Sequence, residues 1–409
     1  MRILSIILSL LMAGIISGSA QPAADNCTDA YGYLWGCRYN EAVKAFSECI
    51  ENTSVPAGED FLYRGIAFFR IMDFKDARTD FLAAREKGVS EADLWLARSY
   101  VTLDDYPQAI HILEEYLQNT SYPDLKAIRK DTVFRPLHTL DAWFQLWQKD
   151  WLSEDTKSVE NARYYLEKYD FKSAHRVIED NIKNSGNKAL LYATSAEIYS
   201  KEDLTGMALH EIIQAISLQP DQYEYLVTKG DLLLKQNKFR DAQLIYTQSL
   251  EVQPMDFNVR VKRCEAAFRA GDLDLAKNDI DRILKYTDKP SISFLAARIA
   301  FGQANYTTVL KYINPLLKKD QSVAGYFKIR GMTYYKTRLY KQAAYDLSMS
   351  LDIDPEDGES NYYLGLTQNA LGNDFLSCYY LKRAAHRGVT EASEYLNRSC
   401  EENEGKTTF

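Results

Sequence analysis

Residues that could carry catalysis or bind a metal are few in this 409-residue chain, and their spacing suits neither task. The five histidines form no pair at metal-ligand spacing, and no Cys-x-x-Cys occurs that would indicate a zinc site. The motifs Gly-x-Ser-x-Gly, Gly-x-x-x-x-Gly-Lys, His-Glu-x-x-His and Gly-x-Gly-x-x-Gly are all missing. We therefore expect a protein that is not an enzyme and has no cofactor or metal.

One acidic segment resembles the beginning of a calcium-binding loop. Residues 352–358 read Asp-Ile-Asp-Pro-Glu-Asp-Gly, but the glycine comes one residue later than such a loop requires. The alternative interpretation, which we favour, is a solvated turn whose acid caps the following helix.

The charge balance excludes one class of partner. Lys and Arg number 49 and Asp and Glu number 57, so the formal net charge is −8 and no basic surface for nucleic acid is indicated. The 19 Gly and 10 Pro residues are too few for a low-complexity chain, whereas 29 Tyr and 17 Phe residues can fill a large core.

The amino terminus has the layout of a secretory signal peptide. Arg2 precedes an apolar run from Ile3 to Ile16, and small residues follow up to Ala20, after which we expect cleavage. The run has 14 residues, fewer than the roughly 20 that span a bilayer, although an uncleaved anchor is the alternative. No later stretch is long and apolar enough to span. We expect residues 1–20 to be removed and the mature chain to be exported without an integral membrane segment.

A phrase of the form aromatic-x-x-Ala recurs along the chain at a nearly constant spacing. The stretches 39–42, 74–77 and 239–242 show it clearly. The last residue of the phrase, which we call the anchor, falls at positions 42, 77, 109, 174, 208, 242, 276, 309, 343 and 377. Apart from a gap of 65 residues after position 109, the spacings are 32 to 35 residues, and 34 is the commonest.

Two further columns align with the anchors. Twelve residues before each anchor stands a small residue, as closely crossing helices require: Ala30, Gly65, Ala97, Ala162, Ala196, Gly230, Cys264, Ala297, Gly331 and Gly365. Four residues after each anchor the residue is always large and mostly apolar, from Phe46 to Leu381. Apolar residues within each unit recur at three- and four-residue steps, so each unit predicts two antiparallel amphipathic helices.

These columns resemble those of tetratricopeptide-repeat (TPR) proteins, and the resemblance covers nearly all of the mature chain. It implies an all-α fold, a right-handed α-solenoid of about ten to eleven TPR-like helix pairs. We expect N-terminal repeats over 21–117, a degenerate Trp-rich helix pair over 118–155, where the spacing breaks, and further repeats over 156–389. A capping helix and a frayed tail are expected over 390–409, since terminal repeats need a cap.

Six cysteines in an exported chain permit disulfides without dictating a framework. Cys378 and Cys400 fall in the last repeat and the helix after it, and we expect this pair to bond. Cys27 with Cys49 is a second candidate pair. Cys264 occupies the column of small residues and is expected to be a core thiol.

The resemblance implies a concave face, lined by the first helix of each unit, that commonly binds a peptide or another protein. Glu197, Asp231 and Glu265 stand eleven residues before successive anchors, with Arg163 and Arg298 in the flanking units. One interpretation is an acidic ladder for a basic segment. The other, which we favour, is that each acid pairs with the base four residues further on, which contributes only about 0.2–0.5 kcal/mol.

A second candidate surface lies in the irregular segment. Trp143, Trp147 and Trp151 stand at i, i+4 and i+8, close to one face of a predicted helix. Tryptophan is frequent in binding hot spots, so this stripe is a candidate docking surface; the alternative is that it fills the space beside an irregular helix pair. If Trp147 is buried, its truncation to Ala should cost about 3–5 kcal/mol.

Export, a full-length solenoid and the lack of chemical motifs favour a scaffold or adaptor that binds a protein or peptide partner. The expected location is the envelope of a bacterium, periplasmic or extracellular. The alternative is the endoplasmic reticulum lumen of a eukaryote, where five Asn-x-Ser/Thr sequons would be relevant. The alternative function is a holdase for unfolded polypeptides, bound by Phe69, Phe268, Phe301 and Tyr335, each eight residues before an anchor. The sequence leaves the partner and the oligomeric state open.

Overall fold

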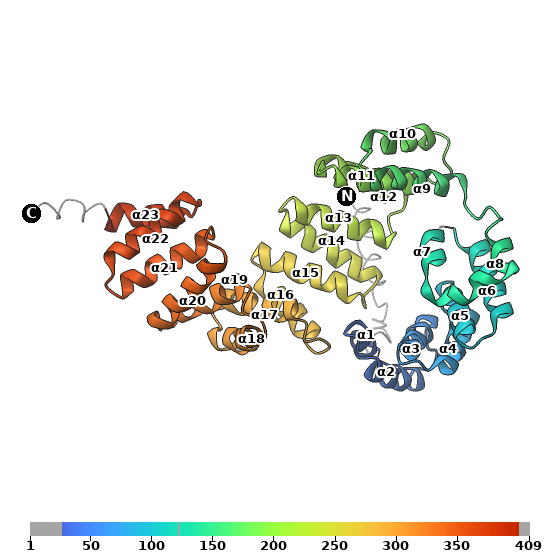
Figure 1. Cartoon of the computed structure of the whole chain (residues 1–409), viewed down its shortest axis with the longest axis horizontal. Helices are drawn as coiled ribbons and strands as arrows, with labels where there is room; N and C mark the ends of the chain where they lie inside the picture. Colours follow the sequence, from blue (N-terminus) through green and yellow to red (C-terminus); the bar gives the residue numbers. More distant parts are fainter. Residues whose placement is uncertain (1–26, 122, 401–409) are drawn as a thin grey trace, which may run out of the picture. The chain divides into compact units, whose positions relative to one another are not determined.

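The computed structural model describes residues 27–121 and 123–400, and every element in that part of the chain is helical. The predicted signal peptide, the sequon at Asn26 and the tail from Glu401 lie outside the described residues. The chain divides after Trp151 into two compact units, Met1–Trp151 and Leu152–Phe409, each of which is described by itself (Figure 1). The prediction of an all-α solenoid built from helix pairs is confirmed.

The first unit contains three regular pairs and an irregular segment. The pairs are α1 (Thr28–Trp35) with α2 (Tyr39–Asn52), α3 (Gly58–Arg70) with α4 (Phe74–Glu86), and α5 (Glu91–Thr102) with α6 (Tyr106–Asn119). The irregular segment holds α7 (Leu125–Lys130), the 3-10 helix η2 (Thr132–Thr139) and α8 (Asp141–Leu146). Three short helices therefore stand where the sequence predicts one degenerate pair, and η2 packs against α5.

The shortness of these helices has local causes. Asp131 ends α7 with an extended backbone, and its side chain accepts a hydrogen bond from the Val133 amide at 3.0 Å, which starts a new helix. Pro136 lies inside η2 and has no amide hydrogen to donate, so the chain cannot form a regular α-helix there.

The second unit contains seven regular pairs and a terminal helix. The pairs are α9 (Glu154–Glu167) with α10 (Phe171–Ile182), α11 (Lys188–Lys201) with α12 (Thr205–Leu218), α13 (Tyr223–Lys235) with α14 (Phe239–Val252), α15 (Phe257–Ala270) with α16 (Leu273–Ile283), α17 (Pro290–Gly302) with α18 (Tyr306–Lys319), α19 (Ala324–Lys336) with α20 (Tyr340–Ile353), and α21 (Gly358–Ala370) with α22 (Asp374–His386). The terminal helix α23 (Thr390–Ser399) packs against α22.

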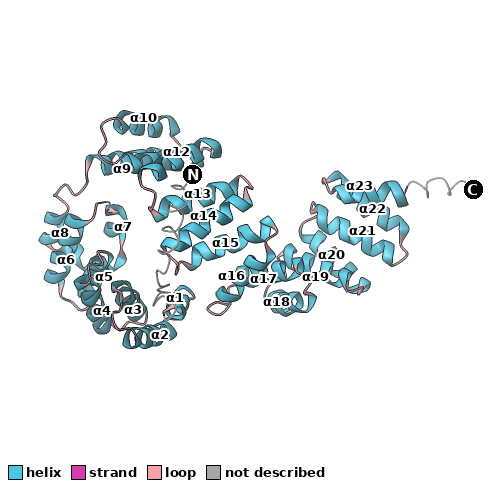
Figure 2. Ribbon diagram, turned by 180° about the vertical axis from the view of Figure 1, so that it is seen from behind, coloured by secondary structure: helices cyan, strands magenta, loops and turns pink. Residues whose placement is uncertain are grey.

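The sequence columns explain how each pair forms. The second helix of all ten regular pairs begins three residues before its anchor, and every anchor is buried. Figure 2 shows the described residues as helices joined by loops. Five of these helices are capped by an acid or an asparagine whose side chain accepts a hydrogen bond from an amide in the first turn: Asp73, Asp105, Asp170, Asp272 and Asn305. Asp357 caps α21 in the same way, so the interpretation of residues 352–358 as a capped turn is confirmed.

The column of small residues marks the crossing of the two helices in each pair. A Cβ atom added to Gly230 on α13 would lie 2.5 Å from Cε1 of Tyr246, which is fully buried on α14. Real side chains do not approach so closely, so only a glycine fits here. Cys264 holds the equivalent place on α15 as a buried free thiol, and the prediction of a core cysteine is confirmed.

Three repeats join their two helices by a buried ion pair. The arginine of the first helix forms two hydrogen bonds with an aspartate sixteen residues later on the second helix. These pairs are Arg64–Asp80, Arg263–Asp279 and Arg330–Asp346. The two-point geometry fixes the relative position of the helices as well as neutralising the aspartate.

The turn between the two helices of each pair contains a residue in the left-handed conformation. It stands five residues before the anchor in all ten pairs, and only Gly271 and Gly372 are glycines there. The other eight are Cys37, Met72, Asp104, Tyr169, Asp203, Asn237, Ala304 and Arg338, with φ between 55° and 67°. A side chain in this region carries a steric cost that glycine avoids.

Exchanging alanine and glycine in this column should therefore change stability in opposite directions. We expect Ala304→Gly, at φ 55°, to raise the free energy of unfolding of the second unit by about 0.5–1 kcal/mol. Gly271→Ala should lower it by about 1–2 kcal/mol through backbone strain alone, because no atom lies within 4 Å of the added Cβ. Urea unfolding followed by circular dichroism measures both. A lower midpoint for Ala304→Gly would contradict the argument.

Candidate functional site

A groove lies between two neighbouring first helices of the second unit, α11 and α13. Its volume is about 440 Å³, and Arg163 of α9 and Ile212 of α12 also reach it. Leu190, Ala193, Ala196, Ile212 and Leu232 supply apolar lining. The charged lining consists of three cations, Arg163, Lys201 and Lys235, and three anions, Glu197, Glu224 and Asp231. The groove thus combines an apolar surface with balanced charges.

The three predicted ladder acids lie on successive first helices, and each contacts a cation of a neighbouring repeat. Arg163 Nε is 3.1 Å from Glu197 Oε2, and Lys262 Nζ is 2.7 Å from Asp231 Oδ2. Arg298 Nη1 is 3.4 Å from Glu265 Oε2. Such partly exposed pairs contribute roughly 0–1 kcal/mol each to stability. They also neutralise the three acids, whereas an acidic ladder for a basic segment requires acids without a partner.

Pairing within one helix, the favoured alternative, holds for one acid of the three. Arg269 Nε donates to Glu265 Oε1 at 2.7 Å. Lys235 instead donates to Asp203 Oδ1 at 2.6 Å and to the Ser200 carbonyl at 3.1 Å. Lys201 has no hydrogen bond or ion pair within the part of the chain that the structure describes, so it is a cation available in the groove.

Two pKa shifts reflect this network. The hydrogen bond from Lys235 lowers the pKa of the Asp203 carboxyl below its usual range, so this ion pair persists to lower pH. Burial raises the pKa of Tyr246, and the hydrogen bond that its hydroxyl donates to Asp231 at 2.7 Å raises it further. Tyr246 therefore stays neutral, and its hydrogen bond holds the carboxylate of Asp231, which lines the groove, in place.

The three tryptophans of the irregular segment do not share one helix face. Helix α8 ends at Leu146, and the Trp151 indole donates its hydrogen bond to the Leu146 carbonyl at 2.9 Å. That carbonyl would bond the amide of residue 150 in a continuing helix, so the indole takes its place. Trp143 is buried, and its ring centroid lies 5.2 Å from that of Trp147. The prediction of a single-helix stripe is wrong, and Trp143 belongs to the core of the first unit.

Sequence reasoning missed Trp95 on α5, which contacts aromatic residues of the preceding helix pair in the first unit. Its ring lies 5.5 Å from that of Phe69 on α3, and the Arg98 guanidinium is 4.5 Å from the Trp95 ring centroid. Arg98 also donates to Asp131 at 2.7 Å. The signal was available in the sequence, because Trp95 stands three residues before Arg98 and so shares a helix face with it.

The four aromatic residues considered for a holdase are engaged with other side chains. Phe69 contacts Phe74 and Trp95, Phe301 contacts Tyr306, and Tyr335 contacts Tyr340 and Tyr363. The Arg298 guanidinium lies 4.7 Å from the Phe268 ring centroid. All four are half-buried. Packing between helices accounts for them, so they do not form an open apolar surface.

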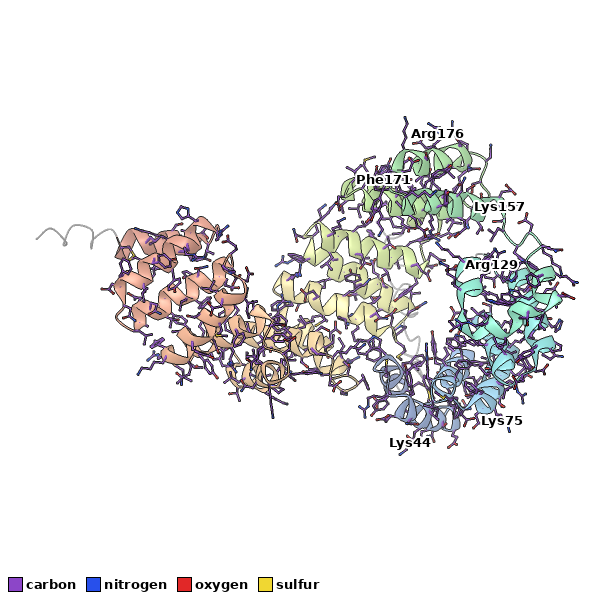
Figure 3. The ribbon with its side chains drawn as sticks, viewed as in Figure 1. Lys44, Lys75, Arg129, Lys157, Phe171 and Arg176 are labelled. Atoms are coloured by element: carbon purple, nitrogen blue, oxygen red, sulfur yellow. A yellow bond between two sulfur atoms is a disulfide. The ribbon has the colours of Figure 1, made fainter. Side chains whose placement is uncertain are left out.

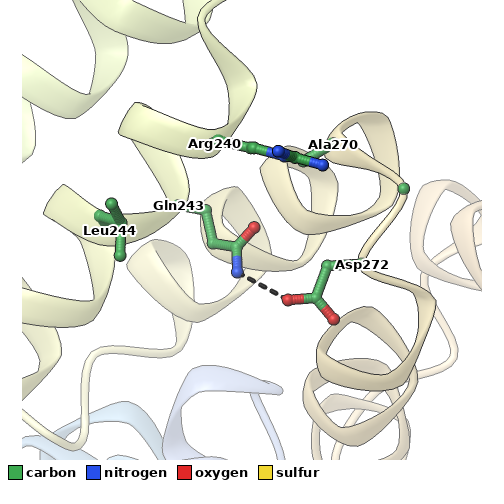
Figure 4. Close-up of a pocket in the computed structure, with 6 residues that line it drawn as sticks. Arg240, Gln243, Leu244, Ala270 and Asp272 are labelled. Carbon is green, nitrogen blue, oxygen red and sulfur yellow. Dashed lines mark hydrogen bonds between the residues drawn. The ribbon is translucent and has the colours of Figure 1, made fainter.

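A second cavity, of about 410 Å³, opens at the turn between α15 and α16. Figure 4 shows Arg240 extending towards Ala270, while Gln243 Nε2 donates to Asp272 Oδ2 at 2.8 Å. Leu244 completes the exposed lining. These groups do not converge on one point, so we assign no ligand to this cavity.

Four of the six cysteines are bonded in the structure. Cys378 pairs with Cys400 and Cys27 with Cys49, at Cα–Cα distances of 5.9 and 5.4 Å. Asp60 lies beside the Cys27–Cys49 disulfide. Among the described residues, these three form the group whose side chains are of the types that bind metals. Because its two sulfurs are bonded to each other, they are not free thiolates for a metal.

Comparisons with known proteins agree with the repeat architecture. A family model described as Tetratricopeptide repeat matches residues 62–124 and 227–284. The chain is 22% identical over 166 residues to DnaJ protein P58IPK homolog A of Oryza sativa subsp. japonica, covering 37% of this chain and 35% of that protein. It is also 22% identical over 212 residues to a TPR repeat-containing protein of Methanocaldococcus jannaschii, covering 49% and 37% respectively. The chain thus spans little more than a third of the length of these curated relatives.

A solved structure extends the likeness to three dimensions. A tetratricopeptide repeat protein from Parabacteroides merdae matches with a TM-score of 0.50 at 16% identity, covering 60% of this chain and 98% of that one. The chain therefore shares the helix-pair α-solenoid fold of that structure, and residues 62–124 and 227–284 match the tetratricopeptide-repeat family model. Within residues 27–121 and 123–400, none of the helices has the length and apolar character needed to cross a membrane.

Proposed function

We propose that the protein is an exported, non-enzymatic scaffold that holds an extended segment of a partner protein in the groove between α11 and α13. The observation that carries this proposal is the groove itself, which combines an apolar surface with polar walls in a volume of about 440 Å³. Sites of this kind bind side chains through apolar contact and orient them through a few polar groups. The balanced charges suit a segment of mixed or no net charge better than a strongly basic one.

Export is supported by two features of the chain. The first twenty residues have the layout of a signal peptide. Two cysteine pairs are bonded, and disulfides persist mainly in oxidising compartments such as the periplasm or the extracellular space. A chain retained in a reducing cytosol would contradict this part of the proposal, and fractionation of the source cells measures it directly.

Filling the groove should weaken partner binding. Thr228 lines the groove, and among the described residues its hydroxyl donates one hydrogen bond, to the Glu224 carbonyl of its own helix at 2.8 Å. Thr228→Trp therefore adds bulk without removing a hydrogen bond between helices. We expect it to weaken binding at least tenfold, about 1.4 kcal/mol, for a partner recovered by in-cell cross-linking and then purified. Asn278→Trp, on an exposed position of α16, is the matched control and should leave the affinity unchanged.

The cross-linking pattern distinguishes the scaffold from the holdase. One or two recurrent partners whose cross-links map to α11 and α13 would support a dedicated scaffold. A broad set of unrelated polypeptides, together with suppressed aggregation of an unfolded client at stoichiometric concentration, would favour the holdase instead. An unchanged affinity of Thr228→Trp would place the binding surface elsewhere on the chain.

A further inference from the structure

Six charged side chains line the groove between α11 and α13, and four of them already have a charged partner. The pairs are Arg163–Glu197, Asp231–Lys262 and Lys235–Asp203. The two that remain are Lys201 and Glu224, and neither forms an ion pair among the described residues. Only these two are free to meet a charge brought by a partner.

Both remaining side chains are exposed. The Glu224 carboxylate accepts a hydrogen bond from the Gln222 side chain, which leaves its negative charge unbalanced. Among the described residues, no charged side chain of a second helix lines the groove, and Figure 3 shows one of them, Arg176 of α10, pointing into solvent. The groove therefore presents one available cation and one available anion.

The helices α11 and α13 run in the same direction, because their corresponding ends are joined. At the carboxyl ends, Lys235 Nζ donates to the Ser200 carbonyl at 3.1 Å. At the amino ends, the side chain of Gln219, just before α13, donates to Oδ1 of Asn187, which caps α11, at 3.5 Å. Residues at the same level of the two helices therefore lie at the same end of the groove.

Lys201 and Glu224 consequently lie at opposite ends of the groove. Lys201 is the last residue of α11, level with Lys235, whereas Glu224 lies in the first turn of α13, eleven residues before Lys235. At 1.5 Å per residue of helix, the two charges are about 16 Å apart along the groove. An extended chain advances about 3.3 Å per residue, so about five residues of a bound segment cover this distance.

The lining between the two charges is uncharged or already paired. Small side chains predominate there: Ala193, Thr194, Ala196, Ser200 and Thr228. Leu190 and Leu232 add apolar surface. A site of this kind admits an apolar side chain and uses a few polar groups at its margin to orient what it binds.

We propose that the groove selects an extended segment in which one acidic and one basic residue stand about five residues apart, with an apolar residue between them. The acidic side chain meets Lys201, the basic side chain meets Glu224, and the apolar one lies against the small residues. Complementary charges of this kind contribute more to specificity than to affinity. The inference rests on the proposed function and specifies the segment that the groove holds.

The helix dipoles offer another explanation of the two charges. Glu224 lies in the first turn of its helix and Lys201 in the last turn of its own, where an acid and a base respectively stabilise a helix. That role needs no partner. It predicts that reversing either charge lowers the unfolding midpoint and leaves the choice of segment unchanged.

The test uses the purified full chain and a library of random peptides displayed on phage. Selection is carried out on the wild type and on Thr228→Trp, in which the groove is filled. We expect the wild type alone to enrich peptides in which an acid and a base recur about five residues apart. One enriched peptide is then synthesised in three forms: unchanged, with its acid replaced by lysine, and with its base replaced by glutamate.

Reversing a charge of the groove should reverse the choice among these peptides. We expect the wild type to bind the unchanged peptide about tenfold more tightly than either altered form, because each alteration replaces an attraction by a repulsion. Lys201→Glu should prefer the peptide whose acid became lysine. Glu224→Lys should prefer the peptide whose base became glutamate. Because both positions are exposed, unchanged circular dichroism should confirm that these variants are folded.

Two matched controls reverse the same charges at the equivalent positions of other repeats. Lys336→Glu on α19 stands seven residues before its anchor, as Lys201 does, and Glu59→Lys on α3 stands eighteen before, as Glu224 does. Both positions are exposed, and both controls should keep the preference of the wild type.

The possible failures of the inference and of the proposed function differ. Peptides that the wild type enriches and Thr228→Trp does not, but that lack an acid and a base at this spacing, would overturn the inference alone. Charge-reversed variants that keep the wild-type preference would also overturn it and assign the two charges to the helix dipoles. Equal enrichment on the wild type and Thr228→Trp, or none on either, would overturn the proposed function and the inference with it.

Discussion

Replacing Asp279 by alanine should lower the free energy of unfolding of the second unit by about 3–5 kcal/mol. Asp279 on α16 is completely buried and is contacted by two arginines of α15. Arg263 donates to both carboxylate oxygens, at 2.7 and 2.8 Å, and Arg260 lies 3.5 Å from Oδ1. Alanine would leave two positive charges in the same buried place without a counter-charge.

The environment of Arg260 makes this loss large. Arg260 is 7% exposed, and burial lowers the pKa of its guanidinium below the usual value even with Asp279 present. Its Nη2 also donates to the Pro254 carbonyl at 2.8 Å, which holds it in place when Asp279 is removed. A buried charge that has lost its partner is expensive, whereas an exposed pair contributes little.

Asp281 provides the matched control two residues further along α16. It is exposed and pairs with Lys277 on the same helix. Asp281→Ala should change the free energy of unfolding by less than about 0.5 kcal/mol. Guanidinium unfolding followed by circular dichroism compares the two variants. Equal small losses for both would show that Arg260 and Arg263 turn to solvent when Asp279 is missing.

The sequence predicts the helix pairs because every repeat requires the same kinds of residue where its two helices cross. The anchor, the small residue twelve before it and the large residue four after it all meet at one crossing of two helices, as Gly230 and Tyr246 do. The 34-residue spacing therefore reveals which side chains are buried between the two helices of one repeat. The left-handed turn residue escaped the same reasoning, because eight of its ten occurrences are not glycine.

The contacts of the candidate groove depend on geometry between repeats, which spacing does not reveal. The spacing predicts that the acids at 197, 231 and 265 lie on successive first helices, but their pairing with Arg163, Lys262 and Arg298 follows from the offset between neighbouring helices. Spacing also does not reveal helix ends that are set by single hydrogen bonds. An example is the end of α8, where the Trp151 indole donates a hydrogen bond to the Leu146 carbonyl.

Replacing Trp143 by alanine should destabilise the first unit by about 3–5 kcal/mol, the cost of removing a buried indole and leaving a cavity. Trp143 is 6% exposed, and its ring centroid lies 4.8 Å from that of His138 and 6.2 Å from that of Phe134. Its contacts join α8 to η2, and these short helices have little stability of their own. Trp147 is only half-buried, so Trp147→Ala should cost less than the value expected for a buried tryptophan.

Phe144, the next residue on α8, provides the control that distinguishes a packing role of the tryptophans from a docking role. It is 57% exposed, so Phe144→Ala should cost less than about 1 kcal/mol. If the tryptophans form a core, Trp143→Ala lowers the unfolding midpoint in guanidinium while Phe144→Ala does not. If instead they form a docking surface, Trp143→Ala weakens partner binding and leaves the midpoint unchanged. The structure favours the first result, because an indole that is already buried has no surface left for a partner to cover.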